Sequence, residues 1–273
     1  MRRKTVTTLG IPILSLVLLL VIWQAIVVVF NVAPYVAPRP FEAIKSVTGN
    51  LGLLWPLIYL TIRETFYGFA LGAILGLLLG VIMARISFLQ KLTYPVLILS
   101  QAVPIIALAP PLVLIMGFSI VPRVFIVMWV VFFPVAVNTL DGLSHVDEDL
   151  VNLGRVYGAS KWRTFFLVEV PASTTSMFTG LKIGATYAVT GAIIAELYAS
   201  DGSSLALYQE HANANLNTAA VYGLTMVMAA IGISWFLIVF GTELLVTPWQ
   251  RRSVARRPLL RRRRDPPKSP TGD

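Results

Sequence analysis

The chain has 273 residues, of which 56% are hydrophobic and only 13% are charged, and its mean hydropathy is +0.77. Soluble domains carry roughly 25% charged residues, so this composition excludes a soluble globular protein and indicates a polytopic membrane protein. The net charge of +9 comes from cations in short loops and one tail, a distribution typical of membrane topology signals and not of a nucleic-acid-binding surface.

The hydrophobic pattern predicts an all-α membrane protein with six transmembrane helices. Residues 1–10 form a basic cytoplasmic N-terminus. The apolar run 11–30 is longer than a signal-peptide core and lacks a small-residue cleavage site, which favours a retained first helix. Residues 34–55 are too polar to span, although a weakly amphipathic stretch at 41–47 suits the outer membrane surface. The other five spans are predicted at 57–83, 93–117, 124–140, 176–198 and 219–246.

One long polar segment, residues 141–171, separates the fourth and fifth spans. Ser144, three residues before Asp147, predicts a capping-box-like helix start. Gly158 can take the left-handed conformation that ends a helix, and Ser160 is placed to cap a second helix. That second helix carries Trp162, Phe165 and Phe166. We expect a helix, a glycine elbow and another helix outside the bilayer, either docking another protein or packing on the inner leaflet.

The positive-inside rule orients the chain. If the N-terminus is cytoplasmic, 17 cations fall in the inner segments and four in the outer ones. The outer four are Arg39, Lys45, Arg63 and Arg123. Both termini and the polar segment 141–171 are then cytoplasmic. The basic, proline-rich tail at 253–273 is predicted to be disordered, and it either contacts anionic lipid or only anchors the topology.

Two spans carry small residues at a spacing of four, which lets another helix backbone approach closely. In the second span these residues are Gly68, Gly72, Gly76 and Gly80, and in the fifth they are Gly180, Gly184, Ala188 and Ala192. The pattern indicates tight helix packing. A weaker interpretation is a close-packed bundle whose interior holds a pathway.

Three residues are candidates for the lining of such a pathway. Glu196, a carboxylate near the outer end of the fifth span, either is structural or faces the pathway. Gln101 and Pro104 lie in a proline-rich third span that we expect to be broken or kinked, which suits a pore lining. Lys182, in the inner half of the fifth span, is expected to extend its amine to the membrane surface.

Motifs for catalysis are missing from the sequence. It has no phosphate-binding GxxxxGK[ST] loop, no HExxH and no GxSxG, and without cysteine it has no thiolate ligands. His145 and His211 are predicted on opposite sides of the membrane, too far apart for a shared metal site. We expect neither an enzyme nor a metal protein.

The polar segment is similar to the cytoplasmic EAA loop of ABC-importer permeases. Gly158, nine further residues and then Val168-Glu169-Val170-Pro171 match that loop's spacing. Residues 191–197 (GAIIAEL) and Thr247-Pro248-Trp249 resemble the branch that handles sulfonates, taurine, nitrate, thiamine precursors and riboflavin. One departure is that Asn152-Leu153-Gly154 stands where the family has Glu-Ala-Ala, which leaves Glu148 or Asp149 to replace the missing carboxylate.

The resemblance implies a type I permease fold over residues 11–252, with coupling helices at 141–171. It implies a partner ATPase dimer that binds ATP and magnesium, a second and identical permease chain, an extracytoplasmic solute-binding protein and the lipids of the cell membrane, with no cofactor in this chain and no nucleic acid. The coupling residues that it implies are Asp149, Asn152, Arg155, Gly158, Ala159, Ser160, Lys161, Trp162, Arg163 and Pro171.

Two other classes remain open from the residues alone. An ion-coupled secondary transporter would need intramembrane acids and internal repeats, and a membrane scaffold would use the glycine ridges only for packing. The sequence encodes no solute. Residues 212–223 (ANANLNTAAVYG) favour vitamin-precursor and riboflavin members over sulfonate members.

Overall fold

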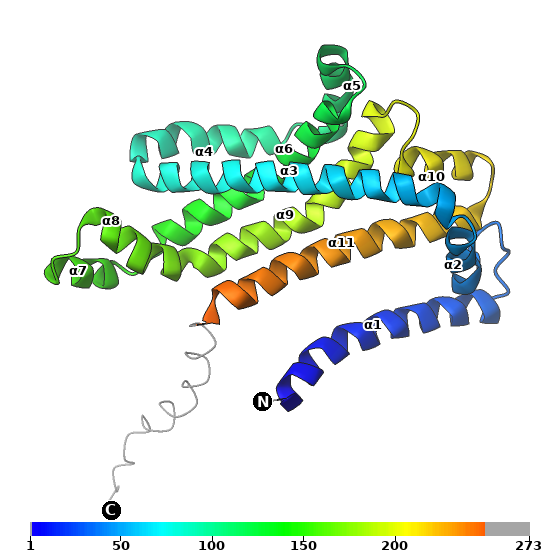
Figure 1. The fold of residues 1–273 in the computed structure, drawn as a ribbon, viewed down its shortest axis with the longest axis horizontal. Coiled ribbons are helices and arrows are strands. Elements are labelled where there is room, and N and C mark those ends of the chain that lie inside the picture. The colour runs from blue at the N-terminus through cyan, green and yellow to red at the C-terminus, as the bar shows by residue number, and fades with distance from the viewer. Residues whose placement is uncertain (1, 249–273) are drawn as a thin grey trace, which may run out of the picture.

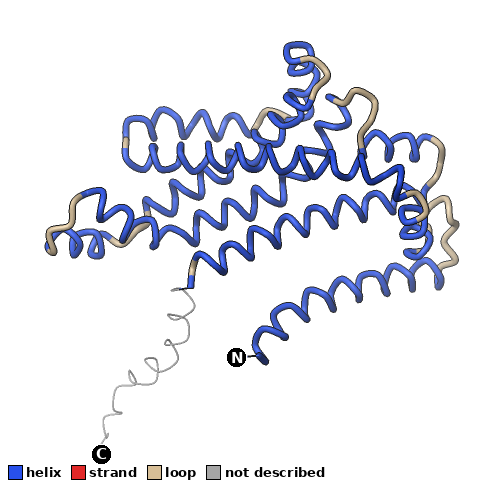
Figure 2. The backbone as a smooth tube through the Cα atoms, in the orientation of Figure 1, coloured by secondary structure: helices blue, strands red, loops and turns tan. Residues whose placement is uncertain are grey.

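The structure, a computed structural model, describes residues 2–248, and the side chains of residues 14–248. Within this range the chain is built from helices, with no strand (Figures 1 and 2). The elements are α1 (Arg2–Val29), α2 (Pro40–Thr48), α3 (Leu51–Arg85), α4 (Ser87–Gln101), α5 (Ile105–Met116), α6 (Ile120–Ser144), α7 (Glu148–Val156), α8 (Lys161–Thr164), the π-helical turn η1 (Phe165–Glu169), α9 (Val170–Ala199), α10 (Leu205–Ala214) and α11 (Thr218–Val246). The predicted tail at 253–273 lies outside the described residues.

Four helical segments are long and apolar enough to cross a membrane. They are α3, α6, the continuous segment Lys161–Ala199 and α11. The bent pair α4 and α5 counts as a fifth crossing if it is one span, and Leu14–Val29 in α1 is a shorter apolar helix. The all-α membrane fold is confirmed, whereas the exact number of six spans is not established by these helices.

The third predicted span is broken, as its prolines indicated. The axes of α4 and α5 differ by 98°, and Pro104 is the N-cap of α5. A proline disfavours helical geometry in the residue before it, which explains why the break falls at 102–104. Pro95, Pro110 and Pro111 lie inside the two helices and do not end them.

Helix α6 lies at the centre of the bundle, between α3 and α9 (Figure 1). Val127, Val131 and Val135 form a fully buried stripe on α6, and Ala188 and Ala192 of α9 complete the same cluster. Both predicted glycine ridges lie against this helix. A Cβ atom at Gly72 would lie 2.7 Å from the carbonyl oxygen of Met128, and one at Gly180 would lie 2.7 Å from that of Pro134.

The two ends of the bundle differ. The α3–α4 turn, the α7–α8 segment and the C-terminal end of α11 lie at one end, and α2 and α10 lie at the other (Figure 1). At the second end, the apolar face of α2 packs with α3, α10 and α11 around Val47, Leu54, Leu205 and Leu224. Ala43 and Val47 of α2 therefore cover a protein core, while Phe41 and Ile44, in the stretch predicted to lie at the membrane surface, are exposed.

Two boundaries differ from the prediction. Helix α3 begins at Leu51, so the second span starts earlier than residue 57. The second helix of the polar segment does not end before the fifth span, because α8, η1 and α9 form one helical segment of 39 residues, Lys161–Ala199. Pro171 lies inside this segment, directly after the π-helical turn η1, so its missing N–H interrupts the regular helical hydrogen bonds there without ending the helix.

Candidate functional site

The polar segment forms the expected pair of short helices at one end of the bundle. Asp147 is the N-cap of α7, and its Oδ1 accepts a hydrogen bond of 2.9 Å from the backbone N–H of Asp149. The predicted cap at Ser144 is wrong, since Ser144 is the last residue of α6. Helix α6 runs on almost to the start of α7, so the helix-start signal in the sequence belongs to Asp147 alone.

Gly158 makes the elbow between α7 and α8. Its φ angle is +75°, in the left-handed region that side chains with a Cβ disfavour. The neighbouring N–H groups close the turn, with Gly158 donating to the Arg155 carbonyl at 2.9 Å and Ala159 to the Gly154 carbonyl at 3.0 Å. Ser160 then caps α8 by accepting from the N–H of Arg163 at 3.3 Å, as the sequence predicted.

Large apolar side chains at this elbow are exposed. Val156 and Tyr157 are each 83% exposed and Trp162 is 74% exposed. The polar coupling residues expected from the family resemblance surround them on the surface, namely Asp149, Asn152, Arg155, Ser160, Lys161 and Arg163. Exposed apolar residues with a polar rim are characteristic of a protein-docking surface. We call residues 147–166 the docking segment.

Phe165 does not belong to this exposed surface. It is only 7% exposed, and the guanidinium of Arg85 lies 4.4 Å from the centre of its ring. Arg85 also forms an ion pair with Glu169, at 2.6 Å between Nη2 and Oε2. The last residue of α3 therefore holds the docking segment to the bundle, and Phe165 contributes to this contact and not to the exposed surface.

Two of the three pathway candidates lie together at the break between α4 and α5. Gln101 and Pro104 line a pocket of about 220 Å³ with Ser100 and with Trp129 and Val130 of α6. Glu196 does not line this pocket. Its side chain is fully buried inside the chain, where Oε1 accepts a hydrogen bond from the Thr61 hydroxyl and Oε2 accepts one of 2.9 Å from the N–H of Ala206.

A second buried acid in this region was missed by the sequence analysis. Glu64 on α3 is 0% exposed and forms an ion pair of 2.7 Å with Arg123 on α6. Arg123 is therefore buried in the bundle, and Arg63 lies within α3, so neither lies in an outer segment beyond the helices, where the sequence analysis had counted them. The signal was present, because an acid and two bases inside apolar stretches need partners.

The family model for the binding-protein-dependent transport system inner membrane component matches residues 72–251, well over half of the chain. The chain belongs to this family. The permease is the membrane subunit of an ABC importer, a transport component whose family works with a solute-binding protein and an ATPase.

Named relatives cover most of the permease. The formylaminopyrimidine transport permease protein of Halalkalibacterium halodurans is 30% identical over 243 residues, which are 88% of this chain and 96% of that protein. The riboflavin transport system permease protein of Chloroflexus aurantiacus is 29% identical over 249 residues, 89% of this chain and 90% of that one. The putative aliphatic sulfonates transport permease protein of Bacillus subtilis is 28% identical over 184 residues, 67% of each.

The permease contains a further ion pair within its spans. Lys182 of α9 donates to Glu243 of α11 at 2.8 Å, and the two side chains are 22% and 10% exposed. The sequence analysis expected Lys182 to extend its amine to the membrane surface. In the structure that amine is paired with Glu243, in the last turn of α11, a partner that the sequence analysis did not identify.

The histidines lie in α6 and α10 as separate residues. His145 is the C-cap of α6, and its Nδ1 lies 3.1 Å from the Asp141 carboxylate and 2.9 Å from the Asp141 carbonyl oxygen. His211 lies in the last turn of α10. No group of three or more acids and histidines able to hold a metal ion exists in the part of the chain that the structure describes.

Proposed function

We propose that this permease imports a small planar nitrogen heterocycle, of the aminopyrimidine or flavin type, across the cell membrane. Support comes from two relatives that align over most of the chain and whose names refer to formylaminopyrimidine and riboflavin. The sulfonate relative aligns over a smaller share. Both heterocycles are flat rings that bear several hydrogen-bond donors and acceptors.

The observation that carries the mechanism is the exposed docking segment. We propose that Tyr157 and Trp162 anchor a separate ATPase subunit, with Arg155, Lys161 and Arg163 forming the rim of the contact. Aromatic side chains and arginine are the residues that dominate such interfaces. ATP and magnesium then bind to that partner, which performs the hydrolysis.

The continuous segment Lys161–Ala199 supports a mechanical role. It has 39 residues and is on the order of 58 Å long at 1.5 Å per residue. Trp162 lies in its first turn and Glu196 in its last, where Glu196 contacts α3 and the start of α10. A movement imposed on the docking segment would therefore reach the far end of the bundle through one unbroken helical segment.

We place the docking segment and both termini in the cytoplasm. Arg123 is buried in the bundle and Arg63 lies within α3, so Arg39 and Lys45 are the only two of the four outer cations that lie outside the long helices. This strengthens the positive-inside bias. Two copies of the chain are proposed to form the pathway. The end that carries α2 and α10 would then face the solute-binding protein.

The test is transport by the complete system in vesicles. The tagged permease is purified in mild detergent with its co-purifying ATPase, reconstituted, and supplied with its solute-binding protein and internal ATP. We expect uptake of a labelled aminopyrimidine or flavin that requires ATP and persists after the proton gradient is collapsed. Recovery of the chain without an ATPase, or uptake that stops with the gradient, would contradict the proposal.

A further inference from the structure

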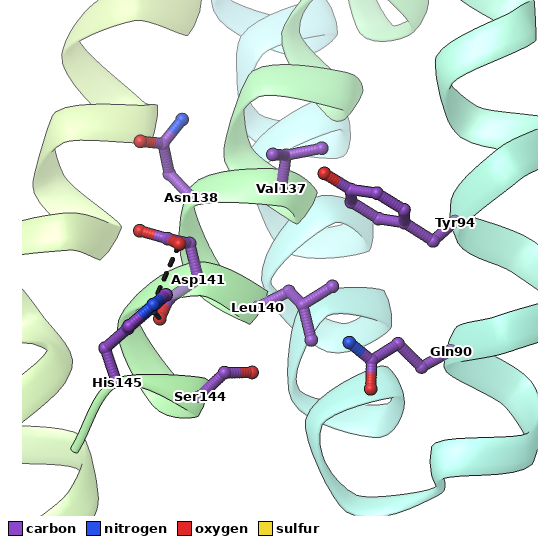
Figure 3. Close-up of a pocket in the computed structure, with 8 residues that line it drawn as sticks. All are labelled: Gln90, Tyr94, Val137, Asn138, Leu140, Asp141, Ser144 and His145. Atoms are coloured by element: carbon purple, nitrogen blue, oxygen red, sulfur yellow. Dashed lines mark hydrogen bonds and ion pairs between the residues drawn. The ribbon is translucent and has the colours of Figure 1, made fainter. Parts of the chain in front are cut away.

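A polar pocket of about 510 Å³ lies between α4 and α6 at the end of the bundle that carries the docking segment. Gln90 and Tyr94 reach toward it from α4, and Val137 and Leu140 of α6 lie in its middle (Figure 3). The other lining residues, also on α6, are Asn138, Asp141, Ser144 and His145. The volume is within the range of about 300–1,000 Å³ that is typical of small-molecule sites.

The lining is the product of two helical stripes. On α4, residues 90, 94 and 97 recur at spacings of four and three, and Leu97 packs with Leu140 in a buried cluster that joins α3, α4 and α6. On α6, residues 137, 138, 141, 144 and 145 also share one face. The same pair of helices, α4 and α6, therefore provides both the apolar contact between Leu97 and Leu140 and the polar side chains of the pocket.

This face must be in contact with water or a solute. The side chain of Asp141 is 60% exposed and that of His145 is 77% exposed, and such groups are costly in contact with lipid tails. Ser144 and His145 end α6, and Asp147 begins the docking segment two residues later. The pocket therefore opens at the inner mouth of the bundle.

Several hydrogen-bonding groups in the pocket have no partner among the described residues. Within residues 14–248, the side chains of Gln90, Tyr94 and Ser144 make no hydrogen bond to another group of the chain. Asn138 donates its amide N–H to the carbonyl of Pro134 at 2.7 Å, which leaves its amide oxygen as an acceptor. Asp141 offers further carboxylate acceptors beside it.

The charge of the lining selects the class of ligand. No lysine or arginine lines the pocket, and its one basic residue, His145, is paired with Asp141 at 3.1 Å. A sulfonate, nitrate or phosphate group would meet a carboxylate here and no free cation. A ring with an exocyclic amine would meet acceptors at Asn138 and Asp141, and Tyr94 provides an aromatic face for stacking.

We propose that this pocket is a solute-binding site on the cytoplasmic side, which holds a planar amino-substituted nitrogen heterocycle before its release. The site rests on the proposed function, since it deepens the assignment of the solute class. Tyr94 stacks on the ring, Asp141 and Asn138 accept hydrogen bonds from its amine, and Gln90 and Ser144 contact the ring edge.

The experiment measures binding of labelled 4-amino-2-methylpyrimidine to the full-length permease–ATPase complex in nanodiscs. ATP and the solute-binding protein are left out, so that bound label reports the membrane subunit. We expect Tyr94→Ala and Asp141→Asn each to weaken binding about tenfold, in the range of one lost stacking or hydrogen-bonding contact. Tyr94→Phe, which keeps the ring, should change binding by less than about twofold.

Three controls make the result specific. Tyr59→Ala changes an exposed tyrosine on α3 that is not part of the pocket, and it should bind the probe like the wild type. 2-Methylpyrimidine, which lacks the amine, should compete about tenfold less well than the probe, and taurine should not compete.

Three outcomes would overturn the site. They are wild-type binding by both Tyr94→Ala and Asp141→Asn, competition by taurine equal to that of the probe, and no binding to the wild-type complex. Each variant is compared with the wild type for recovery of the ATPase during purification, which identifies a protein that has failed to fold. If the complex shows normal ATP-dependent uptake but no binding in this pocket, the proposed site is wrong and the proposed function stands. If the complex binds the probe in a manner that depends on Asp141 but does not transport it, the proposed function is wrong and the binding site stands.

Discussion

The guanidinium of Arg123 lies 2.7 Å from the carboxylate of Glu64, and their side chains are only 5% and 0% exposed. The pair joins α3 to α6 near the end of the bundle that carries α2 and α10. Arg123 is also tied to its own helix, because its Nε donates to the carbonyl of Ser119 at 3.1 Å. Burying two charges is costly, and their attraction offsets that cost only while both partners are present.

We therefore expect Glu64→Leu and Arg123→Met each to lower the free energy of unfolding by about 3–5 kcal/mol, because each leaves a buried charge without its partner. The double variant should recover most of that loss, since an apolar pair of similar volume is often neutral or stabilising. Unfolding of the detergent-solubilised permease is the measurement. Additive losses in the double variant would show that the two residues do not depend on each other.

Glu196 joins the last turn of α9 to the start of α10 through the Ala206 N–H at 2.9 Å, and to α3 through Thr61. Glu196→Ala leaves the buried N–H of Ala206 without its acceptor, at a cost of about 1–3 kcal/mol, whereas the Thr61 hydroxyl can still donate to the Leu57 carbonyl at 3.1 Å. Hydrogen exchange at the first amides of α10 should accelerate in this variant. Glu196→Gln keeps one acceptor oxygen and should protect α10 better than alanine, and equal exchange in the two variants would contradict this role.

The ridge at Gly72 allows α3 and α6 to approach closely. A Cβ atom there would lie 2.7 Å from the Met128 carbonyl oxygen and 2.8 Å from the Val131 Cβ, so Gly72→Ala must push two backbones apart. We expect a loss of about 1–3 kcal/mol, as for other overpacked cores. The matched control is Gly241→Ala in α11, where a Cβ meets no atom within 4 Å. That change should be neutral or stabilise the helix by up to about 1 kcal/mol, and an equal loss at both sites would contradict the packing interpretation.

Local patterns predicted much of this fold. Glycines at a spacing of four identified the close helix contacts, and prolines identified the broken third span. The elbow at Gly158 followed from the conformational freedom of glycine, and the cap at Ser160 from its position before α8. Each of these features depends on residues close together in the chain, so it can be predicted from the sequence.

The ion pairs between helices could not be predicted from such local patterns. Glu64 and Arg123 lie on different helices, as do Lys182 and Glu243, and one sequence does not say which helices are neighbours. Arg123 was assigned to a loop, although α6 begins before it at Ile120, and the other three residues lay within predicted spans with no partner assigned. The pocket left a weaker signal, the spacing of the polar residues Asn138, Asp141 and His145. The sequence analysis did not connect them, because it ended the fourth span at residue 140 and placed Asp141 and His145 in the polar segment, whereas α6 continues to Ser144.

Gly158 provides a test of coupling that does not disturb packing. Its φ angle is +75° and a Cβ there would meet no atom within 4 Å, so a substitution acts through backbone conformation alone. Gly158→Val places a β-branched residue in the left-handed region, at a cost of about 1–3 kcal/mol, and should change the angle between α7 and α8. Gly158→Asn is the matched control, because asparagine adopts this conformation more readily.

We expect Gly158→Val to insert into the membrane and fold, because the substitution changes only the elbow at the surface of the bundle. The reconstituted complex should nevertheless lose most of its solute-stimulated ATPase activity. Gly158→Asn should retain most of that activity. Trp162→Ala, which leaves the elbow intact, should reduce recovery of the ATPase with the permease, because it removes the largest exposed anchor of the docking segment. Wild-type stimulation in Gly158→Val, together with normal ATPase recovery in Trp162→Ala, would mean that the ATPase engages another surface.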